Sequence, residues 1–492
     1  MTVASLAGIL ALLFGTAVVT MGLFAFPRYH RIFLGLLVFT TCYVKKPLYQ
    51  EVFFVNYRGV DRGFGVTLPD LFFFGFFLYM LMGGWRRSVD WLPFNSIPWF
   101  VLIGVSSLSL VGSLDPLLGL FTIHKFVRCW VLYFVIVNVI RHRADLKVVL
   151  GAMALAIILQ GCVVFWDKYI TGRVIARSVG TFRHPNTLAM YTDLILPVLT
   201  AAFLTTAISK RMRSLFVVAI LAGFISVLFT KSRAAMILLP AALGAVVVTS
   251  VVFKPTARKF LVMAVGVVVV SLIVAMALPR LIRRFESAPK ESAETRNYFN
   301  DAAKAMADEN LFGVGINLYS LALSNTDYYW YVYPDRVDVA DPEAFRESVQ
   351  GQSRLGTAHH IYWLYAAETG YIGLVVFVTH IGVFWVYNVI LFFREKDHLF
   401  RSIFLGMLVG TSFHHLHGLL EWIFRQTEVQ YLYFVLMGTM VAMVRIRRDE
   451  RRAQSQALAG HLDPPEQPSQ APVSVASPTL FAGMSRGDLN GS

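Results

Sequence analysis

For most of its length the chain alternates between long apolar runs and short polar segments. A helix needs about 20 apolar residues to cross a bilayer, and on this rule we expect about 12–13 transmembrane helices. The runs lie at residues 5–25, 31–44, 68–84, 97–112, 117–139, 146–166, 186–208, 214–230, 233–252, 259–278, 361–392, 400–419 and 428–445. The pattern therefore predicts an all-α polytopic membrane protein.

The longest polar interval covers residues 280–358, which is too long for a simple connector. Within it, residues 294–310 have helical periodicity, and Gly313-Val314-Gly315 predicts a turn. After the last run the chain is rich in Pro, Ser, Gln and Ala, which is typical of disorder. We expect four regions: transmembrane helices over 1–279, a large loop over 280–358, further transmembrane helices over 359–447 and a disordered tail over 448–492.

Basic residues recur in every second short loop, as in cytoplasmic loops. They are Arg28 and Arg31; Arg86 and Arg87; Arg141, Arg143 and Lys147; Lys210, Arg211 and Arg213; Lys254, Arg258 and Lys259; and Arg394 with Lys396. We therefore expect these loops and the tail in the cytoplasm. The N-terminus and the loop 280–358 then lie on the outer face.

Composition agrees with this class: 56% of the residues are hydrophobic and only 15% are charged, against about 25% in soluble domains. The formal net charge is +14, and much of it is assigned to orientation in the membrane. The partner indicated by the composition is the lipid bilayer, with no indication of nucleic acid.

His359 and His360 stand where the large polar loop ends and an apolar run begins. Histidine takes and gives a proton near neutral pH, so a histidine at this boundary could act on a substrate anchored in the bilayer. The alternative is a pair of interfacial histidines at a helix start.

Arginines at the outer face are the second group of candidates. Arg183 precedes one apolar run, Arg233 lies in a tight turn between two runs, and Arg296 opens the helical part of the loop. Their planar forks match phosphate and indicate an anionic, lipid-linked substrate such as a polyprenyl diphosphate. The alternative is snorkelling at helix ends, which we favour for Arg173 and Arg177.

Charged residues also occur within or near the apolar runs. His124, Lys125 and Arg128 should face the interior of the bundle, because charge is costly in lipid. Glu421 and Arg425 follow a group of histidines, His414, His415 and His417, near the outer end of the last helix pair. The histidine spacing lacks a metal-binding pattern, so no metal site is predicted.

Four segments together resemble a known family. They are Gly180 to Ala189, similar to G-x-F-x-x-x-N-x-x-A; the Ser232-Arg233 turn; Arg296 with the later G-x-G at Gly313; and His359 with Glu368, Gly370 and Gly373, similar to H-N-x-x-L followed by E-x-G-x-x-G. The chain thus resembles the O-antigen ligase and O-antigen polymerase superfamily of bacterial polysaccharide assembly. One departure is His360, where the family usually has Asn.

This resemblance implies a GT-C-like, metal-independent glycosyltransferase without a cofactor, in the bacterial inner membrane with its active face in the periplasm. It would move a glycan from undecaprenyl diphosphate to an acceptor glycan or glycolipid, together with other polysaccharide-assembly proteins. By position, His359 would be the catalytic base, and Arg233, Arg296 and Arg183 would bind the diphosphate. The supporting residues would be His360, Glu368, Glu421 and Arg425.

The resemblance leaves the acceptor open. We favour an O-antigen or exopolysaccharide polymerase, because no feature for binding a lipopolysaccharide core is readable in the sequence. The alternative within the family is an O-antigen ligase acting on lipid A core. An alternative of another class is a small-anion or solute transporter, which Lys125, Arg128 and Glu421 would suit.

Overall fold

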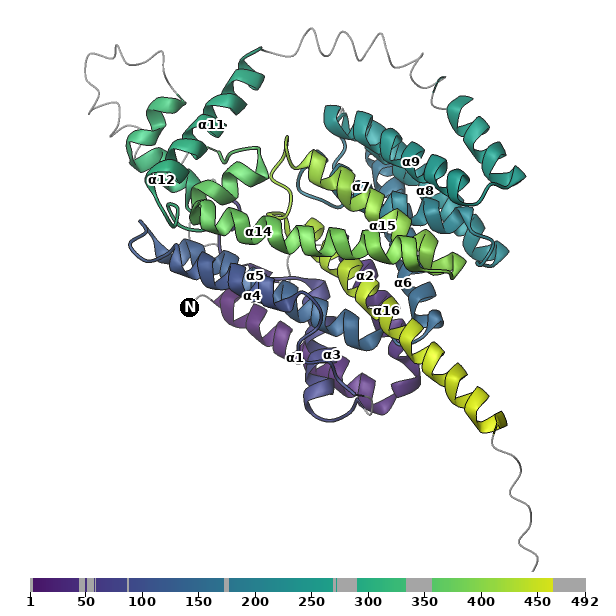
Figure 1. Cartoon of the computed structure of the whole chain (residues 1–492). Coiled ribbons are helices and arrows are strands. Elements are labelled where there is room, and N and C mark those ends of the chain that lie inside the picture. The colour runs from purple at the N-terminus through teal and green to yellow at the C-terminus, as the bar shows by residue number, and fades with distance from the viewer. Residues whose placement is uncertain are drawn as a thin grey trace, which may run out of the picture. The chain divides into compact units, whose positions relative to one another are not determined.

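The computed structural model describes residues 3–43, 49–50, 57, 59–85, 88–171, 177–268, 271, 290–332 and 356–462. Met1–Ile446 forms one compact unit, and Arg447–Ser492 forms a second, smaller one. The helices are α1 Val3–Ala25, α2 His30–Thr40, α3 Leu68–Leu81, α4 Ser96–Leu108, α5 Pro116–Val139, α6 Arg143–Phe165, α7 Pro185–Leu204, α8 Lys210–Thr230, α9 Arg233–Phe253, α11 Lys290–Glu309, α12 Tyr319–Asn325, α14 Ile361–Arg394, α15 His398–His417 and α16 Thr427–Leu462 (Figure 1).

Short elements complete the described chain. The 3-10 turns η1 Pro27–Tyr29 and η3 Asp327–Tyr331 precede α2 and follow α12, and a π-helical turn, η2 Trp166–Ile170, extends α6. Two strands of two residues each, β1 Tyr49–Gln50 and β2 Gly65–Val66, pair antiparallel.

The prediction of an all-α polytopic membrane protein is confirmed. Within the described ranges, eight helices are long and apolar enough to cross a membrane, fewer than the 12–13 expected. The reason is partly that α2, α3 and α4 have only 11, 14 and 13 residues. Apolar side chains continue beyond the end of α3, but Gly83 turns the backbone at φ 72°. The expected run 259–278 is described only at 259–268 and 271.

Helix α7 is the most enclosed helix of the larger unit, because every residue except Phe203 is buried. It packs against α6, α8, α9 and α15. A Cβ atom at Gly406 of α15 would lie 2.5 Å from Cα of Val198, so only glycine allows this crossing. Further along the same two helices Asp193 of α7 meets His417 at the end of α15, with Oδ2 and Nδ1 2.8 Å apart.

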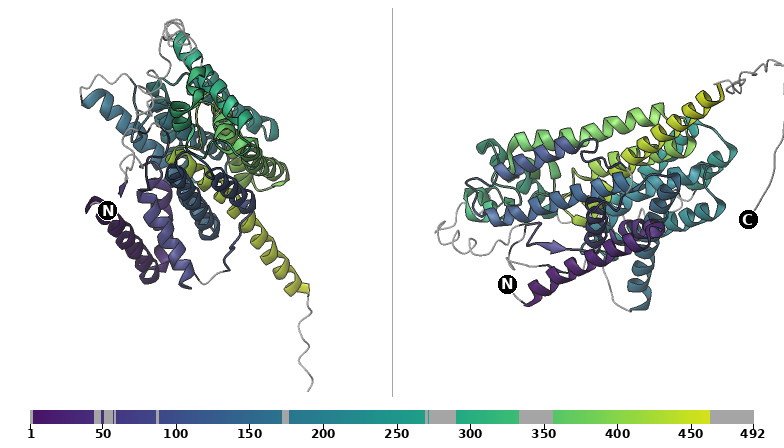
Figure 2. Two further views of the ribbon diagram at one scale, coloured as in Figure 1. Left: turned by 90° about the vertical axis from the view of Figure 1, so that its left-hand side faces the viewer. Right: turned by 90° about the horizontal axis from the view of Figure 1, so that it is seen from below.

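The helices around α7 define two ends of the bundle, which the two views in Figure 2 help to follow. At one end α7 and α9 begin and α8 and α15 finish. We call this the His359 end, because that residue lies there. At the opposite end, which we call the Lys254 end, α7, α9 and α14 finish and α8 and α15 begin.

The long apolar run that begins after His360 is two helical segments. They meet at Gly370, whose φ of 68° and ψ of 176° are not helical. The predicted turn at 313–315 packs against this break: Val314 N donates to Ala367 O at 2.9 Å. A Cβ at Gly313 would lie 2.4 Å from the carbonyl carbon of Glu368, so the two backbones are in direct contact. The helix predicted at 294–310 is confirmed as α11, which packs against α14.

Candidate active site

At the His359 end, three polar side chains converge on the carboxylate of Glu421. Asn186 Nδ2 donates to Oε1 at 2.6 Å, and Arg296 Nη2 lies 3.3 Å from the same oxygen. His359 Nδ1 lies 3.4 Å from Oε2. We call these four residues the Glu421 cluster. The sequence prediction included His359, Arg296 and Glu421, and the structure brings them together.

The chain holds His359 in place through the start of α14. His360 is the N-cap of this helix, and its Nδ1 accepts a hydrogen bond from Trp363 N at 3.3 Å. Partial burial lowers the pKa of His360, and the charge of Lys304 acts in the same direction, so its ring is neutral and able to accept. Ile361 N donates to Gly418 O at 3.0 Å and joins the start of α14 to the segment that carries Glu421.

The function of His360 as a cap explains the departure from the family pattern. Asparagine is among the best N-cap residues, because its side-chain oxygen accepts a backbone N–H of the first turn. The ring nitrogen of His360 makes the same kind of bond. His360 therefore supports His359 through the backbone of α14.

Glu421 is held in its charged form by its neighbours. Burial opposes ionisation, but the hydrogen bond with His359 and the positive charge of Arg296 outweigh it, so the pKa of Glu421 lies below its usual range. An ionised carboxylate beside His359 Nδ1 accepts the proton on that nitrogen. We assign the tautomer on this basis, which leaves Nε2 as the free acceptor.

Exposure separates the members of this cluster. The side chains of His359 and Arg296 are 36% and 35% exposed, whereas that of Glu421 is 5% exposed. The buried carboxylate thus positions two groups that a substrate can reach.

Sequence reasoning assigned Arg177 to snorkelling, but it belongs to a polar network. Its Nη2 donates to Asn186 Oδ1 at 2.7 Å and its Nε donates to Thr230 O at 2.9 Å. Arg177 therefore orients Asn186, which in turn donates to Glu421. Arg173 lies outside the described residues.

The other two predicted diphosphate ligands lie at the same end. Arg233 is the first residue of α9 and is partly buried. Arg183 is exposed and lines a cavity of about 170 Å³ together with Lys125, Arg128 and Arg425. Asp61 and Glu428 line the same cavity, so it holds charges of both signs beside the start of α7, whose cap is His184.

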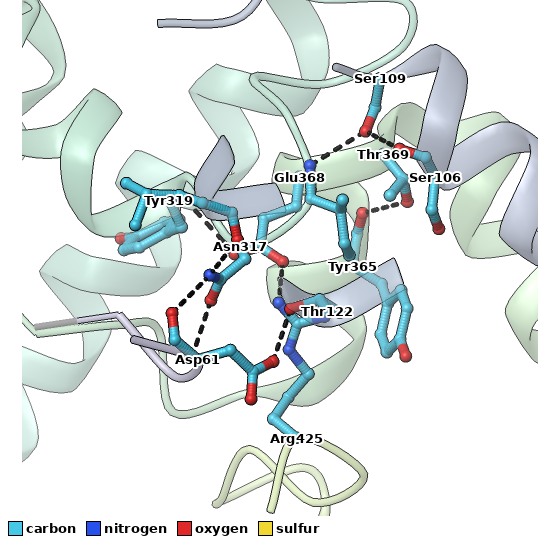
Figure 3. Close-up of polar contacts among 12 residues, drawn as sticks. Asp61, Ser106, Ser109, Thr122, Asn317, Tyr319, Tyr365, Glu368, Thr369 and Arg425 are labelled. Carbon is cyan, nitrogen blue, oxygen red and sulfur yellow. Dashed lines mark hydrogen bonds and ion pairs between the residues drawn. The ribbon is translucent and has the colours of Figure 1, made fainter. Parts of the chain in front are cut away.

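Glu368 and Arg425, predicted as supporting residues, form a separate buried pair, the Glu368 cluster. Glu368 accepts from Arg425 Nη2 and, at 3.4 Å, from Tyr319 N. Figure 3 shows that Asn317 and Asp61 lie beside this pair. Asn317 Nδ2 donates to Asp61 O at 2.8 Å. The structure thus places Glu368 and Arg425 where α14, the turn after α11 and the segment before α16 meet.

Of the three charged residues predicted to face the bundle, Lys125 and Arg128 are buried and each pairs with a carboxylate, whereas His124 is half-buried. Lys125 Nζ lies 2.6 Å from Asp61 Oδ2, and Arg128 pairs with Asp70. The pKa of Asp61 is below its usual range, because the charge and hydrogen bond of Lys125 and the hydroxyl of Thr122 outweigh burial.

Three functional or network residues were missed from the sequence. Asn186 lies in a quoted motif but received no role, and Arg177 and Asp61 stand in loops without a diagnostic pattern. Across the described ranges, no three His, Cys, Asp or Glu side chains are grouped as metal ligands.

The fold and this cluster define a polytopic membrane protein with a reachable histidine and arginine on a buried carboxylate. Residues 216–378 match the family model described as O-Antigen ligase. Over this segment, about a third of the chain, the protein is similar to the O-antigen ligase family. The matched segment contains Arg233, Arg296 and His359, whereas Asn186 and Glu421 lie outside it. No curated protein matches the chain.

Proposed function

We propose that this protein is a membrane glycosyltransferase that polymerises O-antigen or exopolysaccharide, moving a glycan from undecaprenyl diphosphate to an acceptor glycan. The observation that carries the proposal is the Glu421 cluster, which presents His359 and Arg296 side by side. A transfer from a diphosphate needs a base for the acceptor and positive charge for the leaving group. The cluster supplies both.

In the proposed step, Nε2 of His359 takes the proton of the acceptor hydroxyl as its oxygen attacks the anomeric carbon. The bond from this carbon to the diphosphate oxygen breaks, and its electron pair stays on the diphosphate. Arg296, Arg233 and Arg183 neutralise the charge that grows there. Glu421 stabilises the imidazolium that forms, in the way that a buried carboxylate orients the base of a hydrolase triad. The mechanism requires no metal ion.

Arg296 has contacts that suit this role. Its guanidinium is shared between Glu421 Oε1 at 3.3 Å and Leu420 O at 3.5 Å, both long contacts. A guanidinium held loosely and partly exposed can still present donors to a phosphate.

The acceptor distinguishes the polymerase from its alternative, an O-antigen ligase acting on lipid A core. The Glu421 cluster serves either reaction, because only the origin of the attacking hydroxyl differs. The preference for polymerase rests on the lack of a readable core-acceptor feature in the sequence. The transporter alternative drew on Lys125, Arg128 and Glu421, and all three have partners of opposite charge within the bundle.

The proposed location is the bacterial inner membrane, with the His359 end in the periplasm. The basic loops support this orientation, because Lys210, Lys254 and Arg394 lie at the Lys254 end. A periplasmic site gives access to undecaprenyl-diphosphate-linked glycan and to an acceptor glycolipid or other assembly proteins.

The direct test is transfer by purified protein in liposomes that contain undecaprenyl-diphosphate-linked glycan. We expect chain growth with wild type and a loss of about 10²–10⁴-fold in His359→Ala, the usual effect of removing a general base. Equal activity of wild type and His359→Ala would contradict the proposal. Uptake of a small anion without any glycan would instead favour the transporter.

A deletion strain separates the polymerase from the ligase. If long chains disappear, the protein is a polymerase. If lipid-linked long chains persist but no longer reach lipid A core, it is a ligase.

A further inference from the structure

The Lys254 end of the bundle holds five basic side chains around a cavity. The cavity has a volume of about 220 Å³ and lies between the ends of α7, α9, α14 and α15. Its basic residues are Lys254, Arg258, Lys259, His398 and Arg401, and no acidic residue lines it. The remaining wall is partly apolar, with Leu204, Phe253, Phe392 and Leu405.

Three of these basic groups contact a histidine ring or backbone carbonyl groups. Lys254 Nζ lies 2.8 Å from His398 Nε2, and Lys259 Nζ donates to Ser250 O at 2.7 Å. Arg258 donates to Phe203 O. The positive charge of the cavity is therefore not neutralised by these contacts.

Two of the guanidinium groups keep a donor unused. The Nε atoms of Arg258 and Arg401 are buried and have no hydrogen-bond partner in the structure. Arg401 instead lies over the rings of Phe253 and Phe392, at 4.5 Å and 5.3 Å from their centroids. Stacking fixes the plane of a guanidinium and leaves its edge available to an anion.

The two nearby carboxylates, Glu395 and Asp397, do not line the cavity and have partners outside it. Asp397 Oδ2 lies 2.7 Å from Arg143 Nη1, and its Oδ1 caps the start of α15. Glu395 accepts the backbone N–H groups of Lys396 and Asp397 at 2.8 Å and 2.7 Å. Burial and the neighbouring Arg213 lower the pKa of Arg258, as expected where like charges are crowded.

Apolar surface adjoins the charged cavity. Val252 at the end of α9 is 72% exposed, and Phe393 at the end of α14 is 61% exposed. A ligand that combines a phosphate with acyl chains would satisfy both surfaces, since its head would meet the basic groups and its chains would cover Val252 and Phe393.

We propose that this cavity binds the phosphate headgroup of an anionic phospholipid. Basic pockets between transmembrane helices on the cytoplasmic side bind such headgroups, and anionic lipid is present in that leaflet. The site is at the opposite end of the bundle from the Glu421 cluster. The inference rests on the proposed cytoplasmic position of this end but not on the proposed glycosyl transfer.

The test is native mass spectrometry of the full-length protein with phosphatidylglycerol or phosphatidylcholine. We expect wild type to retain phosphatidylglycerol, and Lys254→Gln with Arg401→Gln to bind it about tenfold more weakly or worse. The matched control is Lys210→Gln with Arg211→Gln, which removes the same charge from two exposed residues at this end that do not line the cavity. The control should bind like wild type.

Several results would overturn the proposal. If the control variant loses as much phosphatidylglycerol binding as the cavity variant, the lipid is attracted to the charge of the whole surface and not to the cavity. If inorganic phosphate at millimolar concentration displaces the lipid and binds with an affinity equal to that of phosphatidylglycerol, the ligand is a free anion and not a phospholipid. If the double variant does not fold, the test uses wild type alone. Its Tm should be higher in nanodiscs of phosphatidylglycerol than in nanodiscs of phosphatidylcholine. No rise would contradict the site.

Discussion

The two acidic clusters of this protein are chemically alike but differently exposed. Glu421 faces Arg296, and Glu368 faces Arg425, so each is a buried glutamate beside an arginine. Arg296 is 35% exposed, whereas the side chain of Arg425 is completely buried. Each arginine was a candidate from the sequence, one for the diphosphate and one for support.

This difference in exposure distinguishes the Glu421 cluster, which a substrate could reach, from the Glu368 cluster, whose role is to hold the fold together. A guanidinium sealed against a carboxylate cannot move to a substrate, and removing its partner leaves an unpaired buried charge. A partly exposed guanidinium can exchange one anion for another. The pair alone therefore does not indicate function, whereas the exposure of the arginine does.

The largest expected effect is on stability, through the Glu368 cluster. Glu368→Ala should lower the free energy of unfolding by about 3–5 kcal/mol, because Arg425 remains charged without a partner. Thermal unfolding in detergent measures this. Replacing both residues, as Glu368→Gln with Arg425→Met, should recover part of the loss. If Glu368→Ala keeps the wild-type Tm but loses transfer, Glu368 belongs to the active site.

The second effect concerns Glu421. Glu421→Gln should lower transfer by about 10²-fold, equivalent to about 2.7 kcal/mol, because the partner that orients His359 loses its charge. Expression and folding should be kept. A transfer rate like that of wild type would remove Glu421 from the mechanism.

The same variant should reveal a dependence on pH. The pKa of Glu421 is lowered in the folded protein, so its contribution to stability is present above about pH 4.3, the unfolded pKa, and is lost as pH falls through the folded value. The Tm of wild type should therefore exceed that of Glu421→Gln at pH 7. The gap should close under acidic conditions. A constant gap would contradict the ionised state of Glu421.

The third effect concerns Arg233, the first residue of α9. Arg233→Lys should lower transfer at least about tenfold, or about 1.4 kcal/mol, because an ammonium cannot grip a phosphate with two parallel donors. The protein level should not change. Full activity in both Arg233→Lys and Arg233→Ala would assign Arg233 to snorkelling.

The smallest effect is expected at His360. His360→Ala should cost about 1 kcal/mol through the lost N-cap, whereas His360→Asn should retain both stability and transfer. Thermal unfolding and the transfer assay on the two variants give the comparison. Loss of transfer in His360→Asn with normal stability would give this ring a direct chemical role.

Part of this arrangement could be predicted from the sequence. Apolar runs located α5, α7, α8 and α9 within a few residues, because lipid demands long apolar helices. The motifs also selected His359 and Arg296. Both residues face Glu421 because the starts of α7 and α14 meet the end of α15. No local sequence pattern encodes this tertiary contact.

Two features could not be predicted from the sequence, for physical reasons. An apolar run that contains Gly370 looks like one long helix, because the backbone contact with Gly313 that breaks it is tertiary. The direction of Glu368 follows from that break, so its pairing with Arg425 could not be inferred. The capping role of His360, by contrast, could have been found, since Asn and a helix start are a known combination.

The crossing of α7 and α15 also has a consequence for biogenesis. The ribosome delivers α7 to the membrane long before α15 is synthesised, although α7 is the most buried of the long described helices. Until α15 arrives, the groove that receives Gly406 is unfilled and Asp193 has no His417. The interior is therefore closed by one of the last helices to be inserted, and a nascent chain that stops before His398 lacks the element that completes both ends of the bundle.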